Sequence, residues 1–172
     1  MNSSNLPPAE WARAGLIDDI TGGLTRELLA RSGRHVGAHN TALWLAASEH
    51  LDPVLGTGPH AEHFVGHFLQ PLNQGIVSYV YASGQNICEN AISSNPQHSS
   101  LLDSQLGITT DAMIAVPVVT NGEICGVITC VHTRPAGSGE EPKEFRPADL
   151  EEFDFAAACI GRLLEAALHQ QS

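Results

Sequence analysis

The sequence predicts an α+β fold that combines a long β-hairpin and further strands with helices. Residues 111–132 contain two runs of β-favouring residues joined at Asn121-Gly122, the pair that accepts the positive φ angles of a tight hairpin turn. A short helical pattern follows Gly75 and ends at Gly84, because glycine tolerates the left-handed conformation that terminates a helix. Residues 150–168 carry apolar side chains at helical spacing up to the C-terminus.

The first residues differ in composition from the rest of the chain. Residues 1–12 are polar and contain prolines, which predicts a flexible N-terminus. Residues 13–172 are long enough for a single domain with a substantial core and no need of disulfide or metal support. The apolar spacing predicts a first helix over residues 13–32, weakened at Gly22-Gly23 because glycine is a poor helix former.

Two strands are predicted next, over residues 41–47 and 51–56. The pattern over residues 57–74 leaves the structure open: a short helix can begin near Pro59, and the chain becomes extended near residues 68–72. The helix after Gly75 comes next and closes this half of the chain.

The second half begins with a strand over residues 86–89 and a loop over residues 91–96. One or two helical turns over residues 99–106 are indicated by the spacing of three leucines, and the hairpin follows. Proline, glycine and charge mark residues 133–144 as an exposed connection.

The final helix begins at Pro147, a residue favoured in the first turn of helices. Asp149 and Glu151 suit the positive end of the helix dipole. The apolar stripe of this helix exceeds what one sheet face requires, so we expect a homodimer that packs through the N- and C-terminal helices.

The composition narrows the classes of function. Eight Lys plus Arg against 19 Asp plus Glu give a formal net charge of −11, which disfavours binding to nucleic acid and to anionic membranes. No apolar run is long enough to span a membrane, and the opening MNSSNLPPAEW lacks the features of a signal peptide, so we expect a cytoplasmic protein.

The four cysteines contain no CxxC pair and are interpreted as reduced core thiols: Cys88, Cys125, Cys130 and Cys159. Cys125 and Cys130 stand five positions apart in one predicted strand. Because strand side chains alternate, we expect these two to point to opposite faces of the sheet.

The order of these elements and several motif residues resemble the GAF family of small-molecule sensor domains. The residues that carry the resemblance are Gly75, Gly84-Gln85, Val116-Pro117, Gly122, Gly126-Val127 and Phe145-x-x-x-Asp149, within residues 24–168. The resemblance implies a central antiparallel sheet with the terminal helices on one face. It also implies a ligand cavity under short helices and loops on the other face.

The same resemblance argues against the best-defined activities of the family. Cyclic-nucleotide sensors carry Asn-Lys after the hairpin, where this chain has His132-Thr133, so cyclic-nucleotide binding is doubtful. Bilin attachment needs a cysteine in the cavity helix, and residues 99–106 contain none. The free methionine sulfoxide reductases carry thiols after Gly75 and before the fourth strand, where this chain has Ile76 and Thr109-Thr110-Asp111. No enzymatic activity is expected, and any cofactor is unknown.

Candidate ligand-binding residues follow from the cavity that the resemblance implies. Leu102 lies in the short helix over it, Tyr79 or Tyr81 can project a hydroxyl toward it, and Cys88 is the cysteine expected nearest to it. Polar or flexible side chains at strand ends facing the cavity complete the set, although they can equally be turn formers: Asn86, Asn90, Asp111 and Met113.

Three histidines, His60, His63 and His67, have the i, i+3, i+7 spacing of one helix face. They are candidates for a zinc or iron site, and the alternative is a solvated helix rim. The function that the sequence favours is a GAF-type sensory domain that binds a small molecule and signals through its terminal helices. The alternatives are a ligand-free dimerisation or protein-interaction module and a metal- or redox-responsive sensor.

Overall fold

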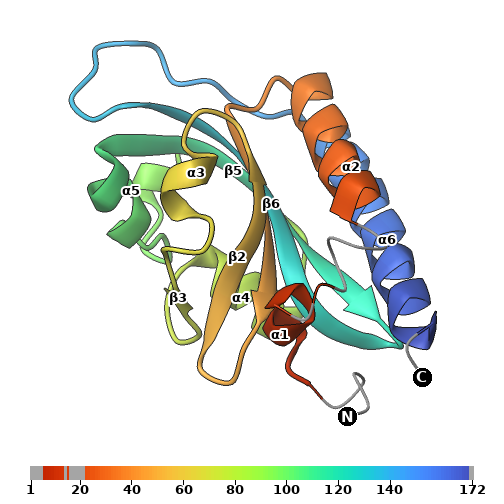
Figure 1. Cartoon of the computed structure of the whole chain (residues 1–172). Coiled ribbons are helices and arrows are strands. Elements are labelled where there is room, and N and C mark those ends of the chain that lie inside the picture. The colour runs from red at the N-terminus through yellow and green to blue at the C-terminus, as the bar shows by residue number, and fades with distance from the viewer. Residues whose placement is uncertain (1–5, 14, 16–21, 171–172) are drawn as a thin grey trace.

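The computed structural model describes residues 6–13, 15 and 22–170, and its centre is a six-stranded antiparallel sheet in the order β3-β2-β1-β6-β5-β4 (Figure 1). The strands are β1 (Asn40–Ala46), β2 (His50–Thr57), β3 (Gln70–Pro71), β4 (Ile87–Asn90), β5 (Ile108–Thr120) and β6 (Glu123–Pro135). The helices are α1 (Pro8–Arg13), α2 (Gly22–His35), α3 (Ala61–Phe64), α4 (Ile76–Ser83), α5 (Leu101–Leu106) and α6 (Pro147–Gln170), with a 3-10 turn η3 (Ile92–Ser94).

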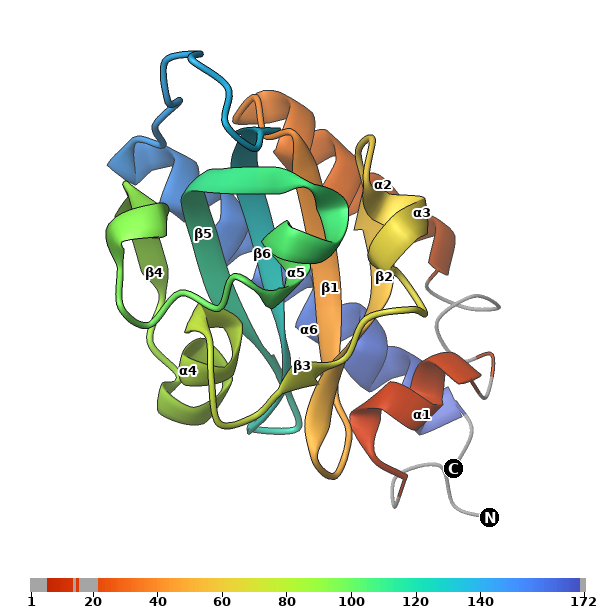
Figure 2. The ribbon, with the colours of Figure 1, turned by 90° about the vertical axis from the view of Figure 1, so that its left-hand side faces the viewer.

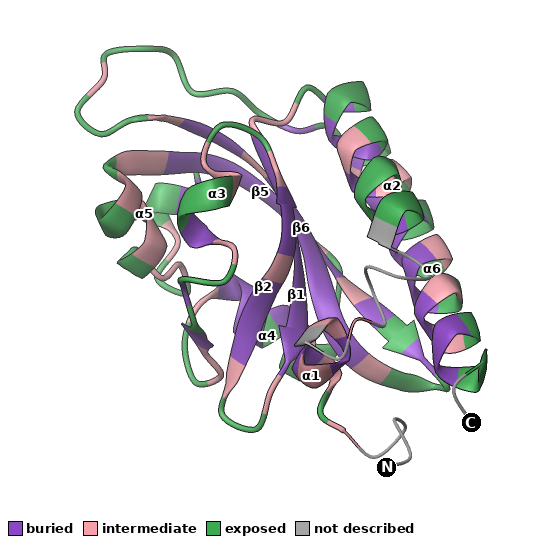
Figure 3. Ribbon diagram, viewed as in Figure 1, coloured by how far each residue is buried: buried purple, intermediate pink, exposed green. Residues whose placement is uncertain are grey.

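The sheet separates two hydrophobic clusters. The long helices α2 and α6 cover one face, and α3, α4 and α5 lie over the other (Figures 1 and 2). Leu29 of α2 and Phe153 of α6 pack with Ile128 on the helix-covered face. Trp44 of β1 packs with Val80 of α4 on the opposite face. The central strands are therefore buried on both sides (Figure 3), and the predicted α+β fold with terminal helices on one face is confirmed.

The structure confirms the predicted hairpin turn and the predicted end of α4. Asn121 and Gly122 have φ angles of 50° and 81°, the positive values that a tight hairpin turn requires. Gly84 ends α4 in the left-handed region at φ 70°, and its N–H donates to the carbonyl of Val80 at 2.9 Å. The hairpin extends beyond the predicted limits, because β5 begins at Ile108 and β6 runs to Pro135.

Helix α6 begins at Pro147, as predicted, and is fixed at its start by a carboxylate. The N–H of Arg146 donates to Asp149 Oδ2 at 2.7 Å, which satisfies one of the free donors of the helix terminus. Ser32 near the end of α2 donates to Glu152 Oε1 near the start of α6 at 2.9 Å. The two terminal helices therefore lie side by side along the sheet (Figure 1).

The N-terminal part of the chain differs from the prediction. Residues 8–13 form α1, and Ala9 and Trp11 are buried in the helix-side cluster, where the sequence predicts a flexible segment. The second part of the predicted helix over residues 13–32 is present as α2, which spans Gly22–His35 and so continues beyond the predicted end, whereas Arg13 belongs to α1. Residues 1–5, 14 and 16–21 lie outside the described part, so the rest of both predictions falls on residues that the structure does not describe.

The predicted opposite orientation of Cys125 and Cys130 is wrong. Both side chains are buried in the helix-side cluster. The β5–β6 register shifts between Val118 and Val119, so that β6 carries an extra residue at this point. Such a β-bulge breaks the alternation of side chains, and the simple parity argument fails across it.

The undecided segment 57–74 contains the one-turn helix α3 and the short strand β3. The predicted loop 91–96 contains the turn η3, whose Ile92 is fully buried. Among the helices that the structure describes, none is both long and apolar enough to cross a membrane.

Candidate functional site

A cavity of about 70 Å³ lies between the sheet and the short helices α3, α4 and α5. One set of lining side chains is apolar: Ala42, Trp44, Phe64, Ile76, Val77, Leu102, Leu106, Ile108, Met113 and Val131. The other lining side chains, Gly75 apart, are polar: Asn40, Thr41, His60, Gln70, His98, Ser99, Asp103, Thr110, Thr129 and Thr133. An apolar pocket with a few converging polar groups is the usual form of a small-molecule site.

The floor of the cavity comes from the central strands. Trp44 of β1 donates its indole N–H to Thr129 Oγ1 of β6 at 3.0 Å, and both groups are buried. The Trp44 ring stacks on Phe64 of α3 with 6.2 Å between ring centroids and 9° between planes. These contacts attach α3 to the sheet beside the cavity.

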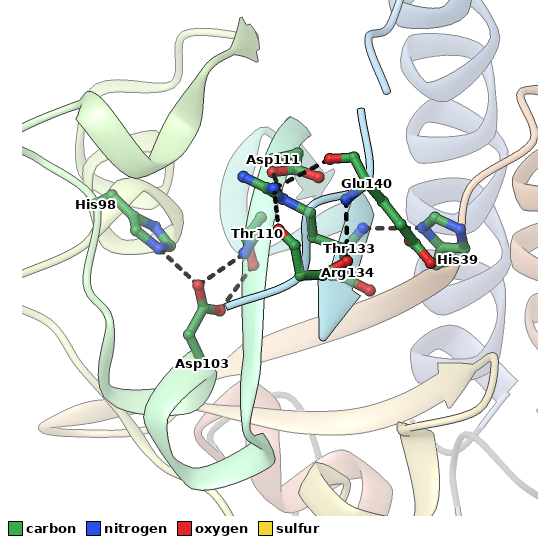
Figure 4. A network of polar contacts seen from close by, with 9 residues as sticks. His39, His98, Asp103, Thr110, Asp111, Thr133, Arg134 and Glu140 are labelled. Atoms are coloured by element: carbon green, nitrogen blue, oxygen red, sulfur yellow. Dashed lines mark hydrogen bonds and ion pairs between the residues drawn. The ribbon is translucent and has the colours of Figure 1, made fainter. Parts of the chain in front are cut away.

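A carboxylate network forms the wall at α5 (Figure 4). Asp103 accepts hydrogen bonds from the Thr110 hydroxyl at 2.7 Å and from the Thr110 N–H at 2.9 Å. Its second oxygen also lies 3.2 Å from His98 Nε2. Burial alone would raise the pKa of Asp103, but the hydrogen bonds from His98 and Thr110 lower it. The cavity therefore contains an ionised carboxylate.

The start of α4 closes another side of the cavity. Gly75 has φ 87°, and a Cβ there would lie 2.9 Å from Gln70 Nε2 and 3.1 Å from the Ser99 Cβ, so only glycine fits without displacement. Gln70 donates to the carbonyl of Gln74 at 2.8 Å and fixes this turn. The Ser99 hydroxyl is buried and has no hydrogen-bond partner among the described residues.

Loops at the upper end of the sheet hold the rim of the cavity. Asn40 and His60 exchange two contacts, from His60 N–H to Asn40 Oδ1 at 3.0 Å and between Asn40 Nδ2 and His60 Nδ1 at 3.1 Å. The N–H of Thr133 donates to His39 Nδ1 at 2.9 Å (Figure 4). Thr133 therefore joins the rim to the segment that follows α2.

Two of the predicted ligand-binding residues, Leu102 and Met113, line the cavity. Tyr79 is exposed and donates to Gln85 Oε1 at 3.1 Å, and Tyr81 packs against the cavity-side cluster without lining the cavity. Burial raises the pKa of the Tyr81 phenol. These two tyrosines are not brought to the cavity.

The strand-end candidates point elsewhere. Asn86 donates to Asp154 Oδ1 on α6 at 3.0 Å, and Asn90 Nδ2 donates to the Phe145 carbonyl at 3.1 Å. Asp111 sits at a register shift of β5 and accepts from Arg134 Nε at 2.9 Å (Figure 4). Hydrogen bonds to α6, to the loop before it and to β6 thus engage three side chains that the sequence analysis places near the cavity.

Cys88 lies on the helix-covered face of the sheet. It pairs with Ile114 in the β4–β5 ladder and packs against the same cluster as that residue. Burial raises the pKa of the Cys88 thiol, and burial raises that of Cys125 to about 11. Cys159 lies on α6, and Cys130 is buried. None of the four cysteines is among the described residues that line the cavity.

The three histidines do not share a helix face. Helix α3 spans only Ala61–Phe64, so His60 precedes it and His67 follows it. His60 lines the cavity, whereas His63 and His67 are exposed. Within the described residues, no group of three or more His, Cys, Asp or Glu side chains is placed to hold a metal ion.

Several lining residues were missed by the sequence prediction, above all Asp103, Thr110, Ser99, Gln70 and Thr129. Thr129 could have been found from the sequence, because Val127, Thr129 and Val131 stand two residues apart in the predicted strand and therefore share its cavity face. The contact between Asp103 and Thr110 depends on how α5 turns into β5, and the local pattern contains no signal for it.

The comparisons with known proteins agree with this geometry. A sequence profile of the GAF domain family matches residues 23–164. The chain belongs to the GAF domain family. GAF domains are generally sensory or regulatory domains. A search of curated protein sequences finds no match.

Solved structures of GAF domains share the fold at low sequence identity. The GAF domain of a phosphoenolpyruvate-protein phosphotransferase from Coxiella burnetii has a TM-score of 0.73 at 12% identity, covering 95% of this chain and 96% of that one. Its counterpart from Acinetobacter has a TM-score of 0.70 at 13% identity, with 99% and 98% covered. A free methionine-R-sulfoxide reductase from Neisseria meningitidis, in complex with its substrate, has a TM-score of 0.64 at 16% identity, with 94% and 86% covered.

Proposed function

We propose that this GAF domain binds a small molecule in the cavity between the sheet and α3, α4 and α5, and that it signals through α2 and α6 in a homodimer. The observation that carries the proposal is the convergence of polar groups, including the ionised Asp103 and the unpartnered Ser99 hydroxyl, on an otherwise apolar cavity. A buried polar group without a partner costs free energy, and a ligand can supply the missing hydrogen bond.

The size of the cavity limits the ligand. A water molecule needs about 10–15 Å³ of such volume, so about 70 Å³ admits a compact molecule and not a nucleotide unless side chains move. The same observation supports the alternative, a ligand-free interaction module in which side chains nearly fill the cavity. The ligand itself is unidentified.

We propose a regulatory and not an enzymatic role. The reductases among the structural neighbours make the opposite case, but thiol chemistry requires an accessible thiolate beside the substrate. None of the described residues that line the cavity is a cysteine. The absence of lysine and arginine from the same lining is also unsuited to the phosphate of a cyclic nucleotide.

A route from the cavity to the terminal helices runs through two histidines. The N–H of Thr133 at the rim donates a hydrogen bond to His39, which follows α2. The His39 ring contacts the His132 ring with 5.5 Å between ring centroids. His132 in turn stacks on Phe145 before α6, with 4.0 Å between centroids. A ligand would act on the helices by binding one arrangement of these contacts more tightly than another.

Native mass spectrometry of the freshly purified protein tests the proposed cavity function. We expect a bound small molecule in the spectrum of the unmodified chain and its loss in Leu102→Trp, because the indole would fill the cavity. The matched control is Leu101→Trp, since Leu101 is 48% exposed and does not line the cavity. A ligand-free spectrum for the unmodified chain would favour the interaction module.

The proposed dimer surface lies on the outer side of α6. Phe155, Cys159 and Leu163 recur every four residues on one side of this helix, and Phe155 is 67% exposed. Leu24 on the neighbouring α2 is 59% exposed. Large exposed apolar side chains on adjacent helices suit helix packing between two copies.

Phe155→Glu is expected to weaken self-association by roughly tenfold or more, because it places a charge in the centre of the proposed interface. Sedimentation equilibrium measures the change. Leu101→Glu, which alters an exposed leucine far from α6 in the fold, serves as the control (Figure 1). A monomer for the unmodified chain at micromolar concentration would contradict the dimer.

A further inference from the structure

We infer that the cavity selects a small organic cation that carries hydrogen-bond donors, such as a protonated amine or an amidinium, with Asp103 as its counter-ion. The inference rests on the proposed function, since it names the chemical class of the ligand for the same cavity. It is carried by the charges that face the cavity and by the hydrogen bonds that hold them.

The charged side chains around the cavity are unbalanced. Asp103 is the only carboxylate among the described lining residues, and neither lysine nor arginine is among them. The nearby cation Arg134 is engaged elsewhere, with Asp111 at 2.9 Å and with the carbonyl of Ser138 at 2.9 Å. An anionic ligand would therefore meet a like charge without a compensating one, whereas a cation would meet an opposite charge.

The structure holds Asp103 in its ionised form. Its two oxygens accept two hydrogen bonds from Thr110, and the pKa of the carboxyl is lowered by its hydrogen bonds although burial alone would raise it. The side chain is 14% exposed. The remaining contact is with His98 Nε2 at 3.2 Å, which neutralises the carboxylate only when the imidazole is protonated. With a neutral imidazole, the negative charge of Asp103 remains.

The N-terminus of α4 favours a negatively charged ligand, and its partial positive charge is to be compared with the negative charge of Asp103. The first turn of α4 lines the cavity with Gly75, Ile76 and Val77. A helix N-terminus carries the equivalent of about half a positive charge, spread over its free N–H groups. A full carboxylate charge outweighs it. The N–H groups are better suited to an oxygen acceptor, which the ligand can carry in addition to its cationic group.

The apolar side of the cavity also suits a cation. Trp44 and Phe64 both line it, and aromatic rings attract cations through their negative faces. The unpartnered Ser99 hydroxyl adds a buried acceptor on the side of α4 and α5. The excess of acidic residues over the whole chain raises the local concentration of cations further.

Three planar probes of nearly equal size separate charge from shape: acetamidinium, acetamide and acetate. The chain contains two tryptophans, and the indole N–H of Trp44 lies in the cavity wall while Trp11 belongs to the helix-side cluster. The Trp44 indole resonance in a two-dimensional NMR spectrum therefore reports on the cavity, and the Trp11 resonance is an internal control. The titrations are run at about pH 8, well above the lowered pKa of the Asp103 carboxyl.

We expect acetamidinium to shift the Trp44 resonance with saturation at a dissociation constant on the order of millimolar, since so small a ligand binds weakly. Acetamide should bind about tenfold more weakly or worse, because it keeps N–H donors but lacks the positive charge that attracts the Asp103 carboxylate. Acetate should not bind, because it has no donor and carries the same charge as Asp103. Asp103→Asn should abolish the preference for acetamidinium. Asp154→Asn, which removes an exposed carboxylate on α6, should retain it.

The comparison of the three probes in the unmodified chain does not depend on the folding of any variant. Equal or tighter binding of acetate or acetamide would overturn the assignment of a cation, while saturable binding would still support a ligand-binding cavity. A Trp44 resonance that does not respond to acetamidinium also overturns the assignment. In that case the native mass spectrum decides separately whether the cavity holds another kind of molecule.

Discussion

Replacing Gly161 with alanine is expected to destabilise the protein by roughly 2 kcal/mol, although the same change normally stabilises a helix by about 1 kcal/mol. Gly161 is buried on the side of α6 that faces the sheet. A Cβ there would lie 2.2 Å from the carbonyl oxygen of Val119, a distance that no ordinary contact allows. Either α6 or the end of the hairpin must move, and the close packing of the core resists that movement.

A second glycine provides the matched control. Gly23 is an exposed residue of α2, and a Cβ there would have no neighbour within 4 Å. Gly23→Ala should therefore leave the stability unchanged or raise it by up to about 1 kcal/mol. For a domain of this size, the Gly161 variant should melt roughly 4–8 °C lower than the unmodified chain. If the two variants shift the melting temperature in the same direction, the contact with Val119 is not the reason that glycine occupies this position.

Predictions from the sequence succeeded where the cause is local. The Asn121-Gly122 turn, the end of α4 at Gly84 and the start of α6 at Pro147 each depend on the backbone preference of one or two residues. The fold followed because these elements occur in an order that resembles the GAF family, which the profile match then confirmed.

Predictions failed where the cause lies between strands. Cys88 faces the helices because the ladder pairs it with Ile114, and Cys125 shares a face with Cys130 because a bulge interrupts β6. Asp111 is turned toward Arg134 at another register shift. Register and bulges are set by pairing between strands, so they cannot be predicted from the residues of one strand alone.

The polar wall of the cavity shows the same limit. Thr110 lies at the start of a β-favouring run, and Asp103 reads as a polar residue of a short helix. Their contact at 2.7 Å arises because α5 ends at Gly107, whose φ of 66° turns the chain back along its own helix. Leu102 does line the cavity, because the family resemblance places its helix there, and its role in ligand binding stays a prediction.

The second large effect is a loss of stability at acidic pH that is caused by a buried histidine. His132 is 4% exposed, and its Nδ1 has no hydrogen-bond partner among the described residues. Its ring stacks on Phe145 with 4.0 Å between ring centroids, and it makes a T-shaped contact with the His39 ring at a centroid distance of 5.5 Å. The groups that act on it are His39, Lys143, Asp149 and Asp111. Burial, followed by the charges of His39 and Lys143, lowers the pKa of His132 to about 4, against the opposing effect of the two carboxylates.

The sign of the pH dependence follows from this pKa. The folded state holds His132 neutral down to about pH 4, whereas the unfolded chain takes up a proton near pH 6.5. Between these values the unfolded state binds more protons, so stability falls as the pH falls. The contribution is complete above about pH 6.5, and roughly 3 kcal/mol is lost by about pH 4. His39 adds to the effect in the same direction, since its pKa is also lowered, first by burial.

Urea unfolding of the unmodified chain and of His132→Phe from about pH 7 to pH 4.5 measures the effect. The phenyl ring keeps the stack on Phe145 and cannot be protonated, so the variant should lose markedly less stability over this range. His63→Phe changes an exposed histidine and should keep the full pH dependence. Asp103 and Asp149 contribute little to the change, because a carboxylate of lowered pKa loses most of its contribution below about pH 4. Parallel curves for the unmodified chain and His132→Phe would show that another group causes the acid sensitivity.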